Sequence, residues 1–188
     1  MRGHSVKRLL VIAGLATAVM AVAASLALAA SPHFKHGGTP TCTIAGSGTN
    51  TTSTTCTGSL TGLGFGDVTI NTTVSGSAVY QCQNNGGNIA PGQNRVLVGP
   101  STTPTTIDSG AIKNGNLTFT TNPATLSAPD TVSGSAAGCP NANWKGVNPN
   151  LTVTSIELSI SQAGSTFYDC TVSNPNGLSG KVAFPASC

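Results

Sequence analysis

All six cysteines of this chain of 188 residues lie beyond a short basic and apolar leader, in a body with very few charged or aromatic side chains. An even number of cysteines in an exported chain is typical of a disulfide framework. We therefore expect three disulfides. Metal binding by the thiols is the alternative, but the chain contains no Cys-X-X-Cys pair. The cysteines are Cys42, Cys56, Cys82, Cys139, Cys170 and Cys188.

The cysteine positions do not fix the connectivity. Our preferred set pairs Cys42 with Cys56, Cys82 with Cys139, and Cys170 with Cys188. The first bond closes a short loop rich in Gly, Ser and Thr, and it contributes about 3 kcal/mol in the chain-entropy model. The last bond holds the carboxyl terminus against the strand before it.

The leader has the three parts of an export signal: a basic start, an apolar run over 9–24, and the small-residue site Ala27-Leu28-Ala29. We interpret residues 1–29 as a cleaved signal peptide. A retained membrane anchor is the alternative, because about 20 apolar residues can span a bilayer. Residue 30 is Ala rather than Cys, which argues against a lipoprotein. The sequence therefore predicts a secreted, extracellular protein without a stable membrane anchor.

The basic character of the chain belongs to its leader. Three of the eight basic residues lie there, so five basic and five acidic side chains remain in the rest of the chain. A chain without a basic patch has no electrostatic attraction for nucleic acid or for an anionic membrane. We expect no nucleic-acid partner.

Period-two alternation recurs along the body, and helical periodicity does not. In residues 68–74, one set of alternate positions is Val68, Ile70, Thr72 and Val74, and the other is Thr69, Asn71 and Thr73, as in a half-buried strand. Similar runs predict strands over 78–83, 95–98, 116–121, 151–161, 167–173 and 181–184. Turn-forming residues separate these runs at 84–87, 91–92, 100–104, 114–115, 122–123, 148–149 and 174–177. We predict an all-β fold, a single antiparallel immunoglobulin-like β-sandwich with three disulfides over 42–188, after a flexible segment over 30–41.

One predicted strand changes its apolar phase. Within 151–161 the apolar positions shift from Leu151 and Val153 to Ile156 and its even-numbered successors. A bulge near Thr154 and Ser155 would keep all of these side chains on one buried face. We predict a bulge at that point.

Several turn motifs occur in a fixed order along the chain. They are Gly62-Leu63-Gly64, Cys82 followed by Asn84-Asn85-Gly86-Gly87-Asn88 and Ala90-Pro91-Gly92-Gln93, then Lys113-Asn114-Gly115-Asn116, and Cys139-Pro140-Asn141-Ala142-Asn143-Trp144. This order resembles a family of uncharacterised exported bacterial β-sandwich proteins, of actinobacterial type, over roughly residues 60–160. The resemblance implies a shared fold and supports pairing Cys82 with Cys139. It implies no catalytic residue.

Side chains for catalysis are scarce. The histidines are His4 in the leader and His33 and His36 in the expected flexible segment, so the expected domain lacks an imidazole base for a nucleophile. The carboxylates are scattered singly, and too few ligands remain for zinc or calcium. A Ser–Lys pair that uses Lys113 or Lys145 is the remaining catalytic alternative. We predict no enzyme activity, no cofactor and no metal site.

Ligand binding can depend on shape and aromatic side chains alone. Trp144 follows Asn141 and Asn143, and Tyr80 and Tyr168 lie in predicted strands. An exposed Trp among amides could stack on a sugar ring, whereas a Trp packed over a core disulfide, which we favour, is common in sandwiches. We predict a non-catalytic structural or interaction domain with an extracellular protein or glycan as partner. The alternative is a module that binds a glycan or a small ligand.

Overall fold

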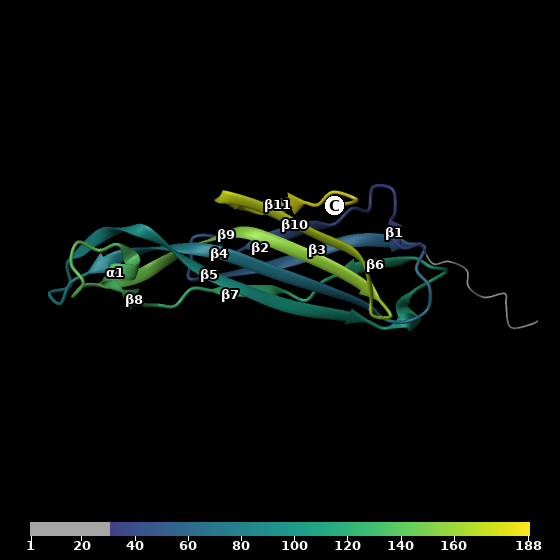
Figure 1. Cartoon of the computed structure of the whole chain (residues 1–188), viewed down its shortest axis with the longest axis horizontal. Helices are drawn as coiled ribbons and strands as arrows, with labels where there is room; N and C mark the ends of the chain where they lie inside the picture. The colour runs from purple at the N-terminus through teal and green to yellow at the C-terminus, as the bar shows by residue number, and fades with distance from the viewer. Residues whose placement is uncertain (1–30) are drawn as a thin grey trace, which may run out of the picture. The chain divides into compact units, whose positions relative to one another are not determined.

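The computed structural model describes residues 31–188, so the predicted signal peptide and Ala30 lie outside the described residues. The described chain forms two antiparallel sheets (Figure 1). Sheet A contains β1 (His33–Phe34), β2 (Thr41–Ala45), β3 (Thr51–Thr61), β6 (Leu117–Thr120), β7 (Ala124–Ser127) and β11 (Gly180–Ala183). Sheet B contains β4 (Val68–Gln83), β5 (Ile89–Ile107), β8 (Val132–Ser133), β9 (Lys145–Gln162) and β10 (Ser165–Leu178). Two short helices, η1 (Ser109–Ala111) and α1 (Gly134–Ala137), complete the elements.

The prediction of an all-β sandwich with three disulfides is confirmed. Contacts between the sheets come from their inner faces. Phe34 of β1 meets Tyr168 of β10 edge to face, with ring centroids 4.7 Å apart. Leu126 of β7 lies so close to β4 that a Cβ added to Gly76 would be 3.0 Å from its methyl carbon. The immunoglobulin-like strand order stays a prediction.

β3 is the central strand of sheet A. Its Thr57 pairs with Thr41 of β2 on one side and with Thr120 of β6 on the other. β1 continues the β2 side of β3, and β7 continues the β6 side. β11 pairs with the free edge of β2. Figure 1 shows β1 and β6 at the end of the sandwich away from α1 and β8.

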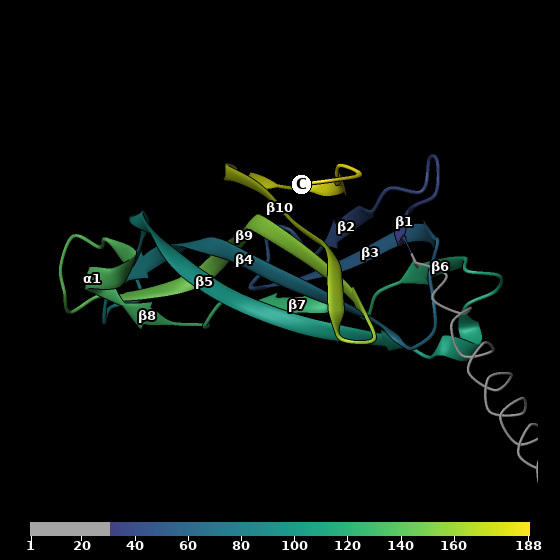
Figure 2. The ribbon, with the colours of Figure 1, turned by 45° about the vertical axis from the view of Figure 1, so that its right-hand side comes forward.

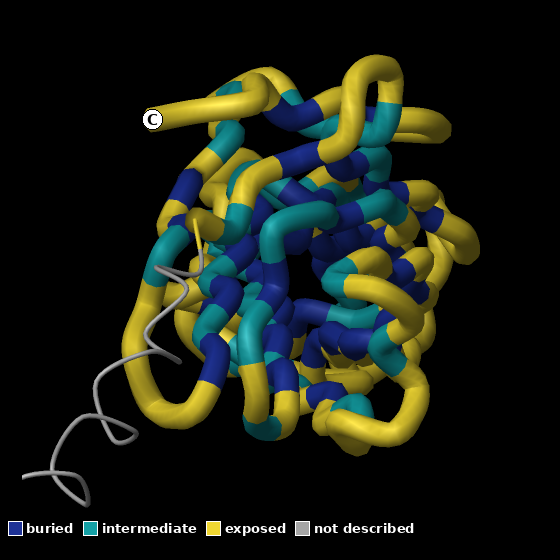
Figure 3. The backbone as a smooth tube through the Cα atoms, turned by 90° about the vertical axis from the view of Figure 1, so that its right-hand side faces the viewer, coloured by how far each residue is buried: buried dark blue, intermediate teal, exposed yellow. Residues whose placement is uncertain are grey.

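Sheet B has the order β10-β9-β4-β5, and β8 pairs with the beginning of β9. Every second side chain of β4 is buried, from Val68 to Cys82. The predicted alternation in residues 68–74 and 78–83 is therefore confirmed. Figures 2 and 3 show the long strands of this sheet and the buried segments gathered on the inside.

The predicted bulge in β9 is confirmed. Ser75 of β4 pairs with Ser155, but the next residue, Gly76, pairs with Val153, so Thr154 is the extra residue of β9. Val153 before the bulge and Ile156 after it are both buried. The bulge therefore corrects the change of apolar phase that the sequence shows.

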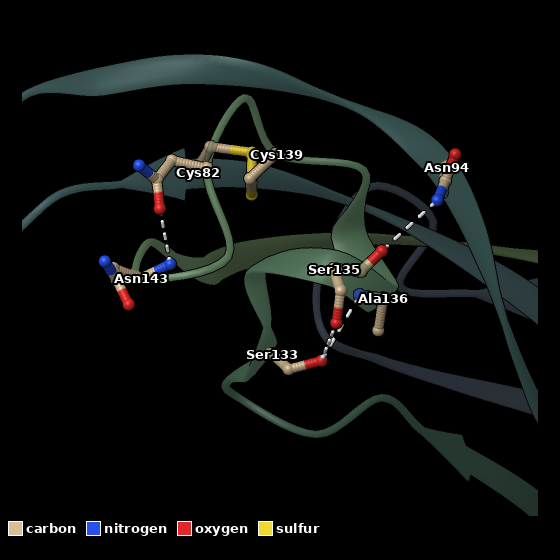
Figure 4. The surroundings of a disulfide bond; sticks show 8 residues. Cys82, Asn94, Ser133, Ser135, Ala136, Cys139 and Asn143 are labelled. Atoms are coloured by element: carbon tan, nitrogen blue, oxygen red, sulfur yellow. Dashed lines mark hydrogen bonds between the residues drawn. A yellow bond between two sulfur atoms is a disulfide. The ribbon is translucent and has the colours of Figure 1, made fainter.

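The disulfides are the three that we preferred from the sequence. Cys42 and Cys56 are register partners in β2 and β3, with Cα atoms 3.9 Å apart. Cys82–Cys139 joins the end of β4 to the residue that follows the C-cap of α1 (Figure 4). Cys170–Cys188 joins β10 of sheet B to the segment that follows β11 of sheet A. The last bond therefore links the two sheets covalently.

Residues 31–41 are the described part of the segment 30–41, which we expect from the sequence to be flexible, and they contribute to the sandwich. His33 pairs with Thr61, and Phe34 pairs with Leu60. The Phe34 side chain is buried, where it packs on Tyr168. The expectation of a flexible segment is therefore wrong for His33–Phe34. Burial of the Phe34 ring between the sheets removes apolar surface from water, and the free energy of this burial favours an ordered segment.

Four of the predicted turns do not end a strand. Positions 91–92 and 100–104 lie inside β5, positions 148–149 inside β9, and positions 174–177 inside β10. Three of these segments coincide with register shifts along the ladders, and the fourth begins within one. Proline is tolerated in β5 because this strand is an edge of sheet B. Turn-forming residues here produce bulges within continuous strands.

The burial pattern predicts unequal effects of two leucine substitutions. Leu158 is fully buried, whereas Leu97 is 87% exposed on β5. We expect Leu158→Ala to lower the free energy of unfolding by about 2–5 kcal/mol. The matched change Leu97→Ala should stay within about 0.5 kcal/mol of the parent protein. Guanidinium unfolding followed by circular dichroism measures both, and equal losses would contradict the assignment of the inner face.

Candidate binding surface

The outer face of sheet B is hollowed where both neighbours of β4 bulge at the same level. Val79 pairs with Arg95 of β5, but Gln81 pairs with Pro91, so β5 contains two more residues than a regular ladder needs between these pairs. On the other side Val79 pairs with Asn150 of β9 and Gln81 with Val147, so β9 contains one more residue than a regular ladder needs. β4 itself keeps its alternation through this level. The extra residues of β5 and β9 therefore flank a level of β4 that has none.

The residues in the bulges have a local reason to be there. A Cβ added to Gly92 would lie 2.3 Å from the Tyr80 carbonyl oxygen and 2.8 Å from that of Ala137, so only glycine fits. Asn148 has a φ of 50°, a left-handed conformation that Asn adopts more readily than most residues. One bulge therefore depends on a residue without a side chain, and the other on a residue that tolerates a left-handed backbone.

The resulting recess, which we call the amide hollow, has a volume of about 520 Å³. Val79 and Ile89 supply its aliphatic surface, and they are 41% and 48% exposed. The remaining lining comes from all three strands and from the β2–β3 turn: Gly48, Tyr80, Gln81, Ala90, Pro91, Gly92, Asn148, Pro149 and Asn150.

Two side-chain amides meet in the amide hollow. Asn148 Nδ2 donates a hydrogen bond of 2.8 Å to Gln81 Oε1. Within the described residues this bond uses one atom of each amide, which leaves the Gln81 nitrogen to donate and the Asn148 oxygen to accept. The pair can therefore form complementary hydrogen bonds with an uncharged polar group.

Arg95 lies beside the amide hollow and contacts the bulge of β10 at 174–177. Arg95, the register partner of Val79, donates a hydrogen bond of 2.7 Å to the carbonyl oxygen of Pro175. Because β5 and β10 are opposite edges of sheet B, this bond crosses the outer face. Ser77, which lies on that face, is buried. The lining of the amide hollow is uncharged, and Arg95 places one positive charge beside it.

Two of the ligand contacts expected from the sequence are internal. Tyr80 and Tyr168 are buried, and their hydroxyl groups donate to the carbonyl oxygens of Pro129 and Pro185 at 2.8 Å and 2.9 Å. Burial, and for Tyr80 also the charge of Asp130, raises the pKa of each phenol, and the pKa of Tyr168 rises to about 12. The expectation that these rings contact a ligand is therefore wrong, because they complete the core.

The other three expected contacts share one loop beyond Cys139. Asn141 and Asn143 are exposed, and the Asn143 backbone N–H donates to Asn141 Oδ1 at 2.8 Å (Figure 4). Trp144 is half-buried and packs against the core cluster. Packing of Trp144 over a disulfide and a ligand role for the loop both stay predictions.

Apart from Tyr80, whose ring is buried, sequence reasoning missed the residues that line the amide hollow. Val79 and Gln81 are ordinary outward positions of an alternating strand, and Asn148 stood in a predicted turn. The available signal was the pair of turn-forming segments, 91–92 and 148–149, on either side of an uninterrupted β4 pattern. Their meeting at one level depends on strand register, which no local pattern records.

No family model and no curated protein matches the chain. Among solved structures it is similar to Bacteroides uniformis β-glucuronidase and to a calcium-binding mutant of Bacteroides uniformis β-glucuronidase 2. Each likeness has a TM-score of 0.36 and 12% identity, and it covers 74% of this chain and 14% of the other. The chain thus spans a small part of those proteins, and a likeness of this degree carries no argument about fold or activity.

No helix within residues 31–188 has the length and apolar character to cross a bilayer. No three His, Cys, Asp or Glu side chains in the same range gather as metal ligands.

The left-handed conformation of Asn148 predicts an order of stability among its variants. The free energy of unfolding of Asn148→Gly should lie within about 0.5 kcal/mol of the parent value, because glycine adopts a positive φ without strain. Asn148→Ala should lower the free energy of unfolding by about 1 kcal/mol, because alanine has a Cβ but no polar side chain that could form a local hydrogen bond in that conformation. Chemical denaturation of the three proteins measures the order. An alanine variant as stable as the glycine variant would contradict the bulge geometry.

Burial of Tyr168 predicts a loss of stability in alkali. Its pKa is raised from 10.0 to about 12. The buried neutral phenol therefore contributes its full share of the unfolding free energy below pH 10, and this contribution is lost as the pH rises toward 12. Tyr168→Phe should therefore show a smaller decline of unfolding free energy across this window. Denaturation at a series of pH values, with tyrosinate absorbance recorded, measures it. Tyrosinate signal from Tyr168 near pH 10 in the folded protein would contradict burial.

Proposed function

We propose that this chain is a secreted, non-catalytic interaction domain that receives an uncharged group of an extracellular partner in the amide hollow. The export-type leader and three disulfides support a location outside the cell, since disulfides persist in oxidising compartments. The sandwich supplies a rigid support, because the amide hollow is built on three paired strands of sheet B.

The observation that carries this proposal is the exposure of aliphatic side chains in a recess. The large hydrophobic side chains exposed within residues 31–188 are Phe65, Val79, Ile89 and Leu97. Val79 and Ile89 line the amide hollow, and Leu97 lies on the neighbouring part of β5. Exposed apolar surface rimmed by polar groups is typical of interaction sites. Covering Val79 and Ile89 would remove apolar area from water at about 25 cal/mol per Å².

The polar part of the lining favours binding over catalysis. Gln81, Asn148 and Asn150 are amides, which neither donate nor accept a proton at neutral pH. Amides pair with peptide groups through one donor and one acceptor. A protein segment with an apolar side chain and an accessible backbone therefore matches both halves of the lining.

A glycan- or small-ligand-binding module is the second candidate. The Gln81–Asn148 amide pair supports it, because amides also bond sugar hydroxyls. It ranks second because Tyr80 contributes to the lining while its ring is buried, so no tyrosine ring is offered for stacking on a sugar.

Parallel screens on the disulfide-bonded protein test the proposal. A displayed peptide library and an array of neutral glycans are each applied to the parent protein, to Ile89→Asp and to Leu97→Asp. We expect peptide binding that Ile89→Asp weakens at least about tenfold, roughly 1.4 kcal/mol, because it puts a charge in the recess. Leu97→Asp, on the same strand but outside the amide hollow, should bind like the parent.

Circular dichroism and thermal unfolding establish that both variants keep the parent fold. Glycan binding lost in Ile89→Asp, without any peptide binding, would replace the proposal with the second candidate. Peptide binding that Ile89→Asp leaves unchanged would overturn the amide hollow as the site.

A further inference from the structure

Phe65 is 93% exposed, the highest exposure among the large hydrophobic side chains of residues 31–188. It lies between Gly64 and Gly66 in the connection from β3 to β4, which we call the Phe65 loop. A phenylalanine ring in water forgoes about 1.5–3 kcal/mol that burial would provide. A partner that buries the Phe65 ring would therefore gain this free energy.

A buried glutamine fixes the backbone on both sides of this ring. Gln162 Nε2 donates to the carbonyl oxygens of Gly64 at 2.9 Å and Gly66 at 3.2 Å. Gln162 Oε1 accepts a hydrogen bond of 3.0 Å from the Gly64 N–H. The amide itself is anchored, because Gln162 pairs with Val68 at the end of β9. The Phe65 loop is thus preorganised, which lowers the conformational entropy that binding costs.

The Phe65 loop and the amide hollow lie toward opposite ends of one strand. β4 begins at Val68, directly after the loop, and Val79 lines the amide hollow eleven residues later. At about 3.3 Å per residue these positions are roughly 36 Å apart. Phe65 therefore cannot reach the amide hollow of its own molecule.

We infer that the partner received by the amide hollow is a second copy of this chain, which inserts Phe65. This inference rests on the proposed function and names the occupant of that site. A cavity of about 150 Å³ holds a benzene ring, so a recess of about 520 Å³ has room for the ring and for flanking glycine backbone. Val79 and Ile89 would cover the ring, and the Gln81 and Asn148 amides would meet the loop backbone.

The charges beside the two surfaces are complementary. Asp67, exposed, is the last residue of the Phe65 loop, and Arg95, exposed, flanks the amide hollow. The loop residues Gly64–Gly66 and the lining of the amide hollow carry no charge. Docking therefore brings unlike charges near each other and desolvates no lone charge, which the low net charge of the chain beyond its leader also favours.

Because the two surfaces differ, the contact joins copies head to tail. Each molecule offers one Phe65 loop and one amide hollow, so assembly continues into open chains unless the rotation closes a ring. One ring and one short loop make a small contact, and small contacts belong to weak, reversible associations. Assembly should therefore depend on concentration.

Sedimentation velocity at protein concentrations up to about 1 mM tests the inference with two half-competent variants. Phe65→Ala keeps the amide hollow and lacks the ring, and Ile89→Asp keeps the ring and blocks the amide hollow. We expect the parent protein to form species that grow with concentration, and each variant alone to stay monomeric. An equimolar mixture of the two variants should form dimers and nothing larger, because each dimer has used its one working pair. Leu97→Asp should assemble like the parent.

A parent protein that stays monomeric throughout, or a Phe65→Ala variant that assembles as well as the parent, would overturn the inference. Such a failure is separable from failure of the proposed function. If selected peptides bind the parent and not Ile89→Asp while the parent stays monomeric, the amide hollow is a binding site for another partner. If neither occurs, both proposals fall.

Discussion

The β4 strand keeps one side-chain phase over its whole length, and the rest of sheet B adjusts to it. From Val68 to Cys82 every second residue faces the core, without interruption. A slip of one residue would move the entire apolar set of a strand into solvent, so burial fixes this phase strongly. The neighbours, β5 and β9, contain proline, glycine and asparagine that do not suit regular pairing. Their mismatches collect in bulges, and the surface features of sheet B follow from where those bulges fall.

The sandwich is built with few of the usual resources. The chain has five Phe, two Tyr and one Trp, so aromatic packing contributes little of its core. Disulfides compensate at three places, and one of them ties sheet B to the segment after the last strand of sheet A. Although aromatic residues are few, Phe65 lies in solvent, and hydrogen bonds from Gln162 fix the loop on both sides of it. That arrangement is unexplained by stability and is consistent with a binding role.

Much of the fold could be predicted from the sequence, because it depends on local pattern. Alternation identified both halves of β4, at 68–74 and 78–83, and a change of apolar phase located the extra residue Thr154 in β9. Export predicted that the six cysteines form disulfides, but their positions did not fix the connectivity, and the set that we preferred is the one observed. The candidate site could not be predicted, because a turn-forming residue gives the same local signal in a bulge as at the end of a strand. Asn148 and Gln81 lie far apart in sequence, and only the register brings their amides within 2.8 Å.

The register shifts of β5 and β9 between Val79 and Gln81 of β4 create the amide hollow, on which its proposed occupant depends. Cross-strand nuclear Overhauser effects measure these shifts most directly. The account predicts contacts between Val79 and the pair Arg95 and Asn150, and contacts of Gln81 with Pro91 and Val147. A regular ladder continued from Val79 would instead place Gln81 opposite Gln93 and Asn148. Contacts of that second kind, with none to Pro91 or Val147, would contradict the account.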